Sequence, residues 1–129
     1  MRFIVHWSSN SMSRPIPVSV VETPEFLAAT RRIMDDEERG LLVDYLARNP
    51  LAGDLIPGTG GIRKLRWALE GRGKRGGARV VYFYHNDALP IFALTAYAKN
   101  ERADLSQADR NDFRRLIALL VERYARRTK

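Results

Sequence analysis

Three strand-like runs follow one another in the second half of the chain, separated only by short turns. Residues 62–69 alternate apolar and polar positions, the next run reads ARVVYFY, and the third extends from Ile91 to Lys99. A Gly-rich turn at residues 71–77 and the dipeptide Asn86-Asp87 connect them. Connections this short join neighbouring antiparallel strands, so the pattern predicts an antiparallel meander.

Capping residues predict three helices outside this meander. Thr23 and Pro24 fit the N-cap and first position of one helix, and Asp35 fits the N-cap of a second. Ser106 and Asp109 form a capping box before a long amphipathic segment, which predicts a C-terminal helix with an apolar stripe.

The order of elements predicts the fold class. Ile16–Glu22, which contains β-branched residues after a proline, predicts a short edge strand. Residues 50–61 contain too many Pro and Gly residues for a regular element and predict a loop. The resulting order, β-α-α-β-β-β-α, indicates an α+β fold: a twisted antiparallel sheet with helices packed on one face.

Length and composition indicate one domain. The chain has 129 residues, and we expect residues 1–15 to be a flexible tail and residues 16–129 to fold as a unit. The sequence contains no Cys, which excludes disulfides, thiolate metal ligands and a cysteine nucleophile. Met1–Trp7 is too short for a signal sequence or a membrane span, so we expect a cytoplasmic protein without membrane attachment.

Positive charge is concentrated in one stretch. The chain contains 22 Lys and Arg against 15 Asp and Glu, a formal net charge of +7. Between residues 62 and 79, one acid, Glu70, accompanies seven bases: Arg63, Lys64, Arg66, Arg72, Lys74, Arg75 and Arg79. A patch of one sign over a strand, a turn and the next strand favours a phosphate ligand, although protection of a sheet edge is the simpler alternative. The spacing of the Gly-rich turn is not that of a P-loop, which argues against nucleotide hydrolysis.

The same stretch resembles a known family. The runs GTGGIRKLRWALEGRGKRGGARVVYFY and LTAYAKNERADLS are similar to the core of RelE/HigB toxins, with the HigB branch as the nearest match. They resemble three patterns of that branch: a GxGGxRKxR strand, a GKGKRGGxRxxY turn and strand, and a YxKNExxDL segment. The resemblance extends from about residue 18 to residue 123. It implies a microbial-RNase-like α+β fold and a toxin that enters the ribosomal A site and cleaves mRNA.

The resemblance also implies site residues. By motif, the catalytic residues fall on Lys64, Arg66, Arg79 and Lys99. Contacts with RNA and the ribosome are implied for Arg63, Arg72, Lys74, Arg75, Tyr82, Tyr97 and Asn100. The last segment departs from RelE itself, because Lys99-Asn100-Glu101-Arg102 is followed by Ser106 where RelE has a catalytic tyrosine. The identity of the general base therefore stays open.

The expected mechanism needs neither a metal nor a cofactor. The RNA 2′-hydroxyl attacks the adjacent phosphorus while Arg66 and Arg79 hold the phosphoryl oxygens. Lys64 or Lys99 is expected to transfer protons, because many positive neighbours lower the pKa of an ammonium group. Tyr82 and Tyr97 either stack on a base or are ordinary core aromatics. Catalysis by His6 and His85, or by a metal site, is the weaker alternative.

The expected partners are translated mRNA, ribosomal RNA and an antitoxin of HigA type with a helix-turn-helix domain. A different class of function remains open: an RNA- or ribosome-binding module without cleavage, or an inactive toxin that acts as corepressor. The edge strand Ile16–Glu22 or the C-terminal helix could receive the antitoxin. We prefer to interpret both apolar faces as internal core.

Overall fold

The computed structural model describes residues 16–69, 77–101 and 104–127. Along the chain the elements are β1 (Val20–Glu22), α1 (Pro24–Arg31), α2 (Asp36–Arg48), β2 (Asp54–Leu55), β3 (Ile62–Trp67), β4 (Ala78–Phe83), β5 (Ile91–Ala98) and α3 (Gln107–Arg127). The expected order is confirmed, with one addition: the two-residue strand β2 lies in the segment predicted as a loop. The expected tail, residues 1–15, lies outside the described residues.

The five strands form one mixed sheet in the order β1-β5-β4-β3-β2. The predicted antiparallel meander β3-β4-β5 is confirmed. A wholly antiparallel sheet is wrong, because β1 pairs with β5 in parallel, with Val20 opposite Ile91. Strands paired in parallel are not joined by a tight turn, so no local sequence signal marks this pairing. The first strand is also shorter than Ile16–Glu22.

All three predicted helix starts are confirmed. Thr23 Oγ1 accepts a hydrogen bond from the Phe26 amide at 3.2 Å, and Asp35 Oδ1 accepts one from the Glu38 amide at 2.8 Å. Ser106 Oγ accepts from the Asp109 amide at 3.0 Å, and Asp109 Oδ2 accepts from the Ser106 amide at 3.3 Å. Each cap satisfies amides that have no partner within their own helix.

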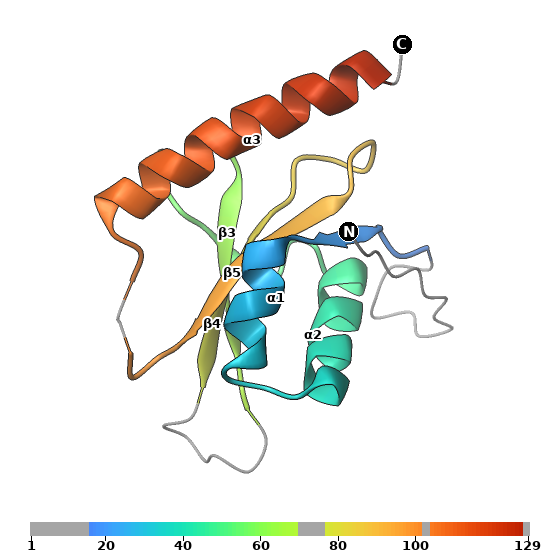
Figure 1. Cartoon of the computed structure of the whole chain (residues 1–129). Helices are drawn as coiled ribbons and strands as arrows, with labels where there is room; N and C mark the ends of the chain where they lie inside the picture. Colours follow the sequence, from blue (N-terminus) through green and yellow to red (C-terminus); the bar gives the residue numbers. More distant parts are fainter. Residues whose placement is uncertain (1–15, 70–76, 102–103, 128–129) are drawn as a thin grey trace.

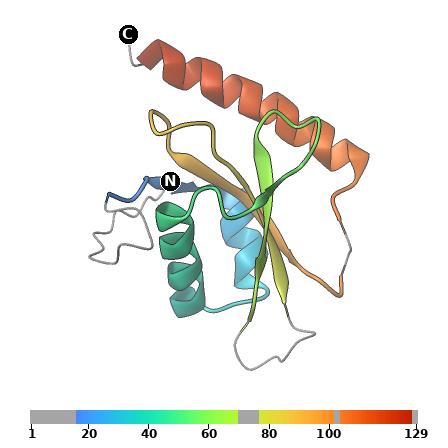
Figure 2. The same ribbon diagram turned by 180° about the vertical axis from the view of Figure 1, so that it is seen from behind.

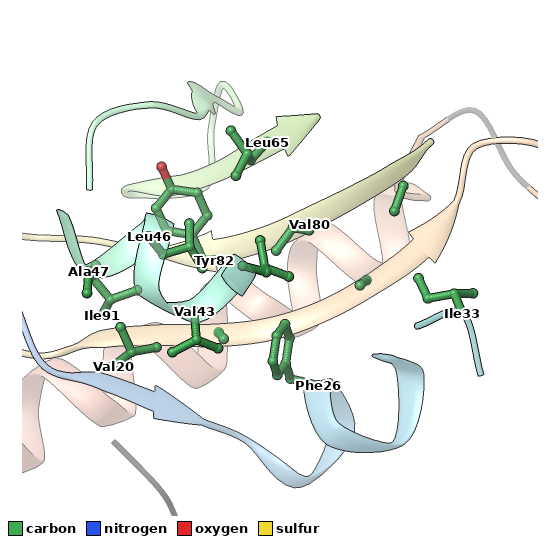
Figure 3. Packing of buried hydrophobic residues seen from close by; sticks show 14 of the residues in the cluster. Val20, Phe26, Ile33, Val43, Leu46, Ala47, Leu65, Val80, Tyr82 and Ile91 are labelled. Carbon is green, nitrogen blue, oxygen red and sulfur yellow. The ribbon is translucent and has the colours of Figure 1, made fainter. Parts of the chain in front are cut away.

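Helices cover both faces of the sheet, which corrects the expectation of a single covered face (Figures 1 and 2). Helices α1 and α2 lie on the face where Phe26 and Leu46 contact strand residues such as Val80 and Ile91 (Figure 3). Helix α3 lies on the opposite face. Apolar residues in adjacent positions of β4 point alternately to the two faces, so this strand requires cover on both sides.

Helix α3 covers only one end of its face. Its residue Tyr124 meets Phe92 edge to face, with ring centroids 5.5 Å apart. Arg114 Nη1 donates to the Gly58 carbonyl at 3.1 Å, just before β3 begins. Figures 1 and 2 show α3 crossing this end of the strands, while β3 and β4 extend away from it toward residues 67 and 78. The helix therefore does not cross the opposite end of the same face, where Arg66 is exposed.

Within residues 16–69, 77–101 and 104–127, no helix has the length and apolar character needed to cross a membrane.

Candidate functional site

Strand alternation directs three basic side chains to the face that carries α3. Leu65 and Trp67 in β3 contact the core beneath α1 and α2, so Lys64 and Arg66 point to the other face. The same argument places Arg79 on that face, because its neighbours in β4 belong to the core beneath α1 and α2. The three residues lie toward the end of the sheet that α3 leaves uncovered.

Arg66 and Arg79 are directly opposite each other on paired strands. Opposed residues of an antiparallel pair have Cβ atoms about 5 Å apart, and like charges in this arrangement destabilise the sheet. Among the described residues, neither arginine has an acidic ion-pair partner. A bound anion would relieve the repulsion, so this pair has the electrostatics of a phosphate-binding site.

Lys64 belongs to a charged cluster that the sequence did not reveal. Its Nζ lies 3.0 Å from Asp104 Oδ1, and Arg110 Nη2 lies 3.2 Å from Asp104 Oδ2. The hydrogen bond from Lys64 is the largest cause that holds the pKa of Asp104 below its ordinary value. Lys64 and Asp104 are 40 positions apart, so only the return of the chain from β5 to α3 brings them together.

Lys99 and Asn100 are exposed in the turn that follows β5. The Lys99 amide donates to the Gly77 carbonyl at 2.9 Å, which places this turn beside the start of β4, two residues from Arg79. Glu101 shapes the turn, because its carboxylate accepts from the Ala98 amide at 3.1 Å and pairs with Arg32 at 2.9 Å. The turn thus adds a lysine at the uncovered end of the sheet.

Arg63 is separated from the other predicted basic residues. It precedes Lys64 in β3 and therefore points to the face of α1 and α2. Its Nη1 donates to the carbonyls of Gly53 at 2.7 Å and Leu51 at 3.4 Å. The expected RNA contact for Arg63 is therefore corrected: this guanidinium holds the loop that leads to β2.

The stacking role expected for the two tyrosines is also corrected. Tyr82 is 0% exposed and lies in the core beneath α1 and α2, and Tyr97 is 4% exposed in the core beneath α3. Tyr82 Oη accepts from the Gly53 amide and donates to the Pro50 carbonyl, both at 2.8 Å. Burial raises the pKa of Tyr82, which keeps this hydroxyl protonated and able to donate. Neither ring has a free face for a base.

The structure predicts that Tyr82→Phe destabilises the protein. The substitution keeps the ring but leaves the Gly53 amide and the Pro50 carbonyl without their buried partner, which costs about 1–3 kcal/mol. Urea unfolding measures the loss. Tyr84→Phe is the matched control, because it removes an exposed hydroxyl bonded to Asp87 and should cost about 0.5 kcal/mol or less. Equal losses in the two variants would contradict the role of Tyr82.

The remaining predicted residues lie either outside the described part of the chain or away from this group. Arg72, Lys74, Arg75 and His6 lie outside the described residues. His85 is exposed beyond the far end of β4, roughly 20 Å along the strand from Arg79, and stacks on Phe83 with ring centroids 6.0 Å apart. In the described ranges, no three His, Asp or Glu side chains are placed to hold a metal ion.

Comparison with known protein families agrees with this architecture. The family described as "RelE toxin of RelE / RelB toxin-antitoxin system" matches residues 28–127. The match begins in α1 and includes α2, the whole meander and α3. The α+β fold, with its five-stranded mixed sheet and three helices, is consistent with this family. The chain therefore belongs to the RelE family of toxins, whose members act in toxin-antitoxin systems.

Proposed function

We propose that this toxin is a metal-independent endoribonuclease that cleaves mRNA in the ribosomal A site and thereby inhibits translation. The observation that supports the proposal is the group of Lys64, Arg66 and Arg79 on one face of the sheet, at the end that α3 leaves open. The two arginines oppose each other without an acidic partner among the described residues, as expected of a surface prepared for a phosphate.

The proposed reaction is an internal transfer at phosphorus. The RNA 2′-hydroxyl gives up its proton to a base or to water, and its oxygen forms a bond to the adjacent phosphorus. The bond from phosphorus to the 5′-oxygen breaks at the same time, and the 5′-oxygen takes up a proton to leave as a hydroxyl. Negative charge builds up on the phosphoryl oxygens, where Arg66 and Arg79 donate hydrogen bonds. Lys64 lies on the same strand as Arg66, and Lys99 lies in the turn beside the start of β4; these ammonium groups add positive charge or a proton. These residues supply the charge stabilisation that a metal ion provides in other nucleases.

The proposed partners follow from the same surface. The basic run continues in the sequence through Arg72, Lys74 and Arg75, and Asn100 stands in the turn after β5. We propose that these four residues contact ribosomal RNA. A toxin of this family is paired with an antitoxin. The HigB-like motifs of β3, β4 and the turn after β5 support an antitoxin of HigA type with a helix-turn-helix domain. Residues 16–129 are proposed as the toxin domain, which would work in the cytoplasm, where translated mRNA is found.

Controlled expression tests the function. Induction of the chain alone should arrest growth, and co-expression of the antitoxin encoded beside it should relieve the arrest. Mapping of mRNA 5′ ends after induction should show new cuts within translated codons. Growth arrest with intact messages would instead support translational blockade without cleavage, and growth unaffected by the chain would remove the proposal.

A further inference from the structure

We infer that Asp104 is a positioning residue of the proposed ribonuclease site, which holds Lys64 toward the reacting phosphate. The inference rests on the proposed function. Its basis is the short contact of 3.0 Å from Lys64 Nζ to Asp104 Oδ1, on the strand that also carries Arg66.

Asp104 is itself fixed by two further contacts. Its Oδ1 accepts from the Leu105 amide at 2.8 Å, and its Oδ2 is 3.2 Å from Arg110 Nη2 in the first turn of α3. Leu105 is 5% exposed and belongs to the core beneath α3. The Asp104 carboxylate therefore links Lys64 on the sheet to the start of α3, which is anchored by the buried Leu105. This link gives the Lys64 ammonium a defined direction although its aliphatic chain is flexible.

A contribution to stability does not explain this acid. The side chains of Asp104 and Lys64 are 43% and 27% exposed, and ion pairs this accessible contribute about 1 kcal/mol or less. An acid also weakens simple binding of RNA, because it repels phosphate. A surface made only for binding would not gain from a carboxylate at this place, whereas a site that needs one oriented ammonium would.

The contact changes the role expected for Lys64. Of the charged groups around it, Arg66 on β3, Arg79 on β4 and Arg110 on α3 are cations, and Asp104 is the carboxylate. The Lys64 ammonium donates a hydrogen bond of 3.0 Å to this carboxylate, which fixes its direction. Lys64 then acts as a proton donor to the departing 5′-oxygen, and proton removal from the 2′-hydroxyl belongs to another group.

The test uses the purified full chain added to ribosomes programmed with a defined mRNA, and it measures cleavage rates. Asp104→Asn should slow cleavage roughly tenfold or more, because small displacements of a catalytic group cost up to about 100-fold. Asp104→Glu should recover part of the rate, because it keeps a carboxylate that can hold Lys64. Asp112→Asn is the control: it removes a carboxylate from α3 that pairs with Arg115 instead, and the rate should stay unchanged.

A second readout does not depend on cleavage. In the wild type, NMR titration should place the pKa of Asp104 below that of an ordinary aspartate, and Lys64→Gln should raise it toward the ordinary value. A wild-type cleavage rate in Asp104→Asn, or a titration of Asp104 that is insensitive to Lys64→Gln, would overturn the inference. If the wild-type chain leaves mRNA intact, the proposed function is wrong. If the wild type and Asp104→Asn cleave mRNA equally well, only the role of Asp104 is wrong.

Discussion

Arg79→Ala is expected to lower ribosome-dependent mRNA cleavage by about 100-fold or more, because it removes one of two opposed guanidinium groups proposed to hold the phosphate. The fold should tolerate the change, since Arg79 points to the uncovered end of the sheet and its neighbours Ala78 and Val80 form the core contacts. Cleavage of a defined message and urea unfolding are measured on the same preparation.

The same variant should be as stable as the wild type or slightly more stable. Removal of Arg79 relieves its repulsion with Arg66, and like-charged pairs directly opposite each other cost roughly 0.2–1 kcal/mol. If the variant cleaves mRNA more slowly but is at least as stable as the wild type, Arg79 is needed for activity and lowers the stability of the fold.

Two further variants isolate the chemistry of Arg79. Arg79→Lys keeps the charge but cannot form bidentate hydrogen bonds with phosphate oxygens, so its cleavage rate should be only slightly higher than that of Arg79→Ala. Arg126→Ala is the control for charge: it removes an exposed arginine near the C-terminal end of α3, at the opposite end of this helix from Asp104, and should leave cleavage unchanged. Wild-type cleavage by Arg79→Ala, or equal losses in Arg79→Ala and Arg126→Ala, would exclude Arg79 from the site.

Arg39→Leu is expected to destabilise the protein by about 3–5 kcal/mol, a large part of the roughly 5–15 kcal/mol that holds a domain together. The Glu22 side chain is fully buried in β1, and its Oε1 lies 3.0 Å from Nε of Arg39 on α2. Removal of the guanidinium leaves the buried carboxylate without this cation, and a charge in that state is costly. Denaturant unfolding gives the loss directly.

Arg48→Leu provides the matched control on the same helix. Arg48 pairs with Asp44 one turn away at 3.2 Å, and both side chains are partly exposed, so its loss should cost about 1 kcal/mol or less. The double variant Glu22→Leu with Arg39→Leu should recover most of the stability, because burying two apolar side chains carries no free-energy cost of removing charges from water. Equal losses from Arg39→Leu and Arg48→Leu would contradict the importance of the buried pair.

Elements controlled by neighbouring residues could be predicted from the sequence. Thr23, Asp35 and Ser106 each cap a helix whose first amides lie within three residues, so the signal and its effect are local. The meander was equally readable, since short turns leave antiparallel pairing as the direct outcome. The strand β2 was missed because its two residues pair with β3 within a Pro- and Gly-rich segment.

Side-chain roles were predicted less completely. Successive side chains of β3 point to opposite faces of the sheet, so Lys64 and Arg66 lie on one face and Arg63 on the other. A count of basic residues in the sequence does not distinguish the two faces. Tyr82 has the same strand-forming character whether it meets a base or the core, and only the position of the Pro50–Gly53 loop decides between them. Asp104 stands in the segment quoted for the family resemblance, yet no local pattern connects it with Lys64.

The sequence by itself determined the class of fold, the helix starts, the meander and the concentration of positive charge between residues 62 and 79, because these depend on periodicity and on contacts a few residues apart. The tertiary structure alone decided the parallel pairing of β1 with β5, the cover on both faces, and the meeting of Lys64 with Asp104 and Arg110. The parallel strands pair residues 71 positions apart, and Lys64 and Asp104 are 40 positions apart. Such contacts form only when the whole chain buries its apolar surface together, so no stretch of sequence specifies them alone.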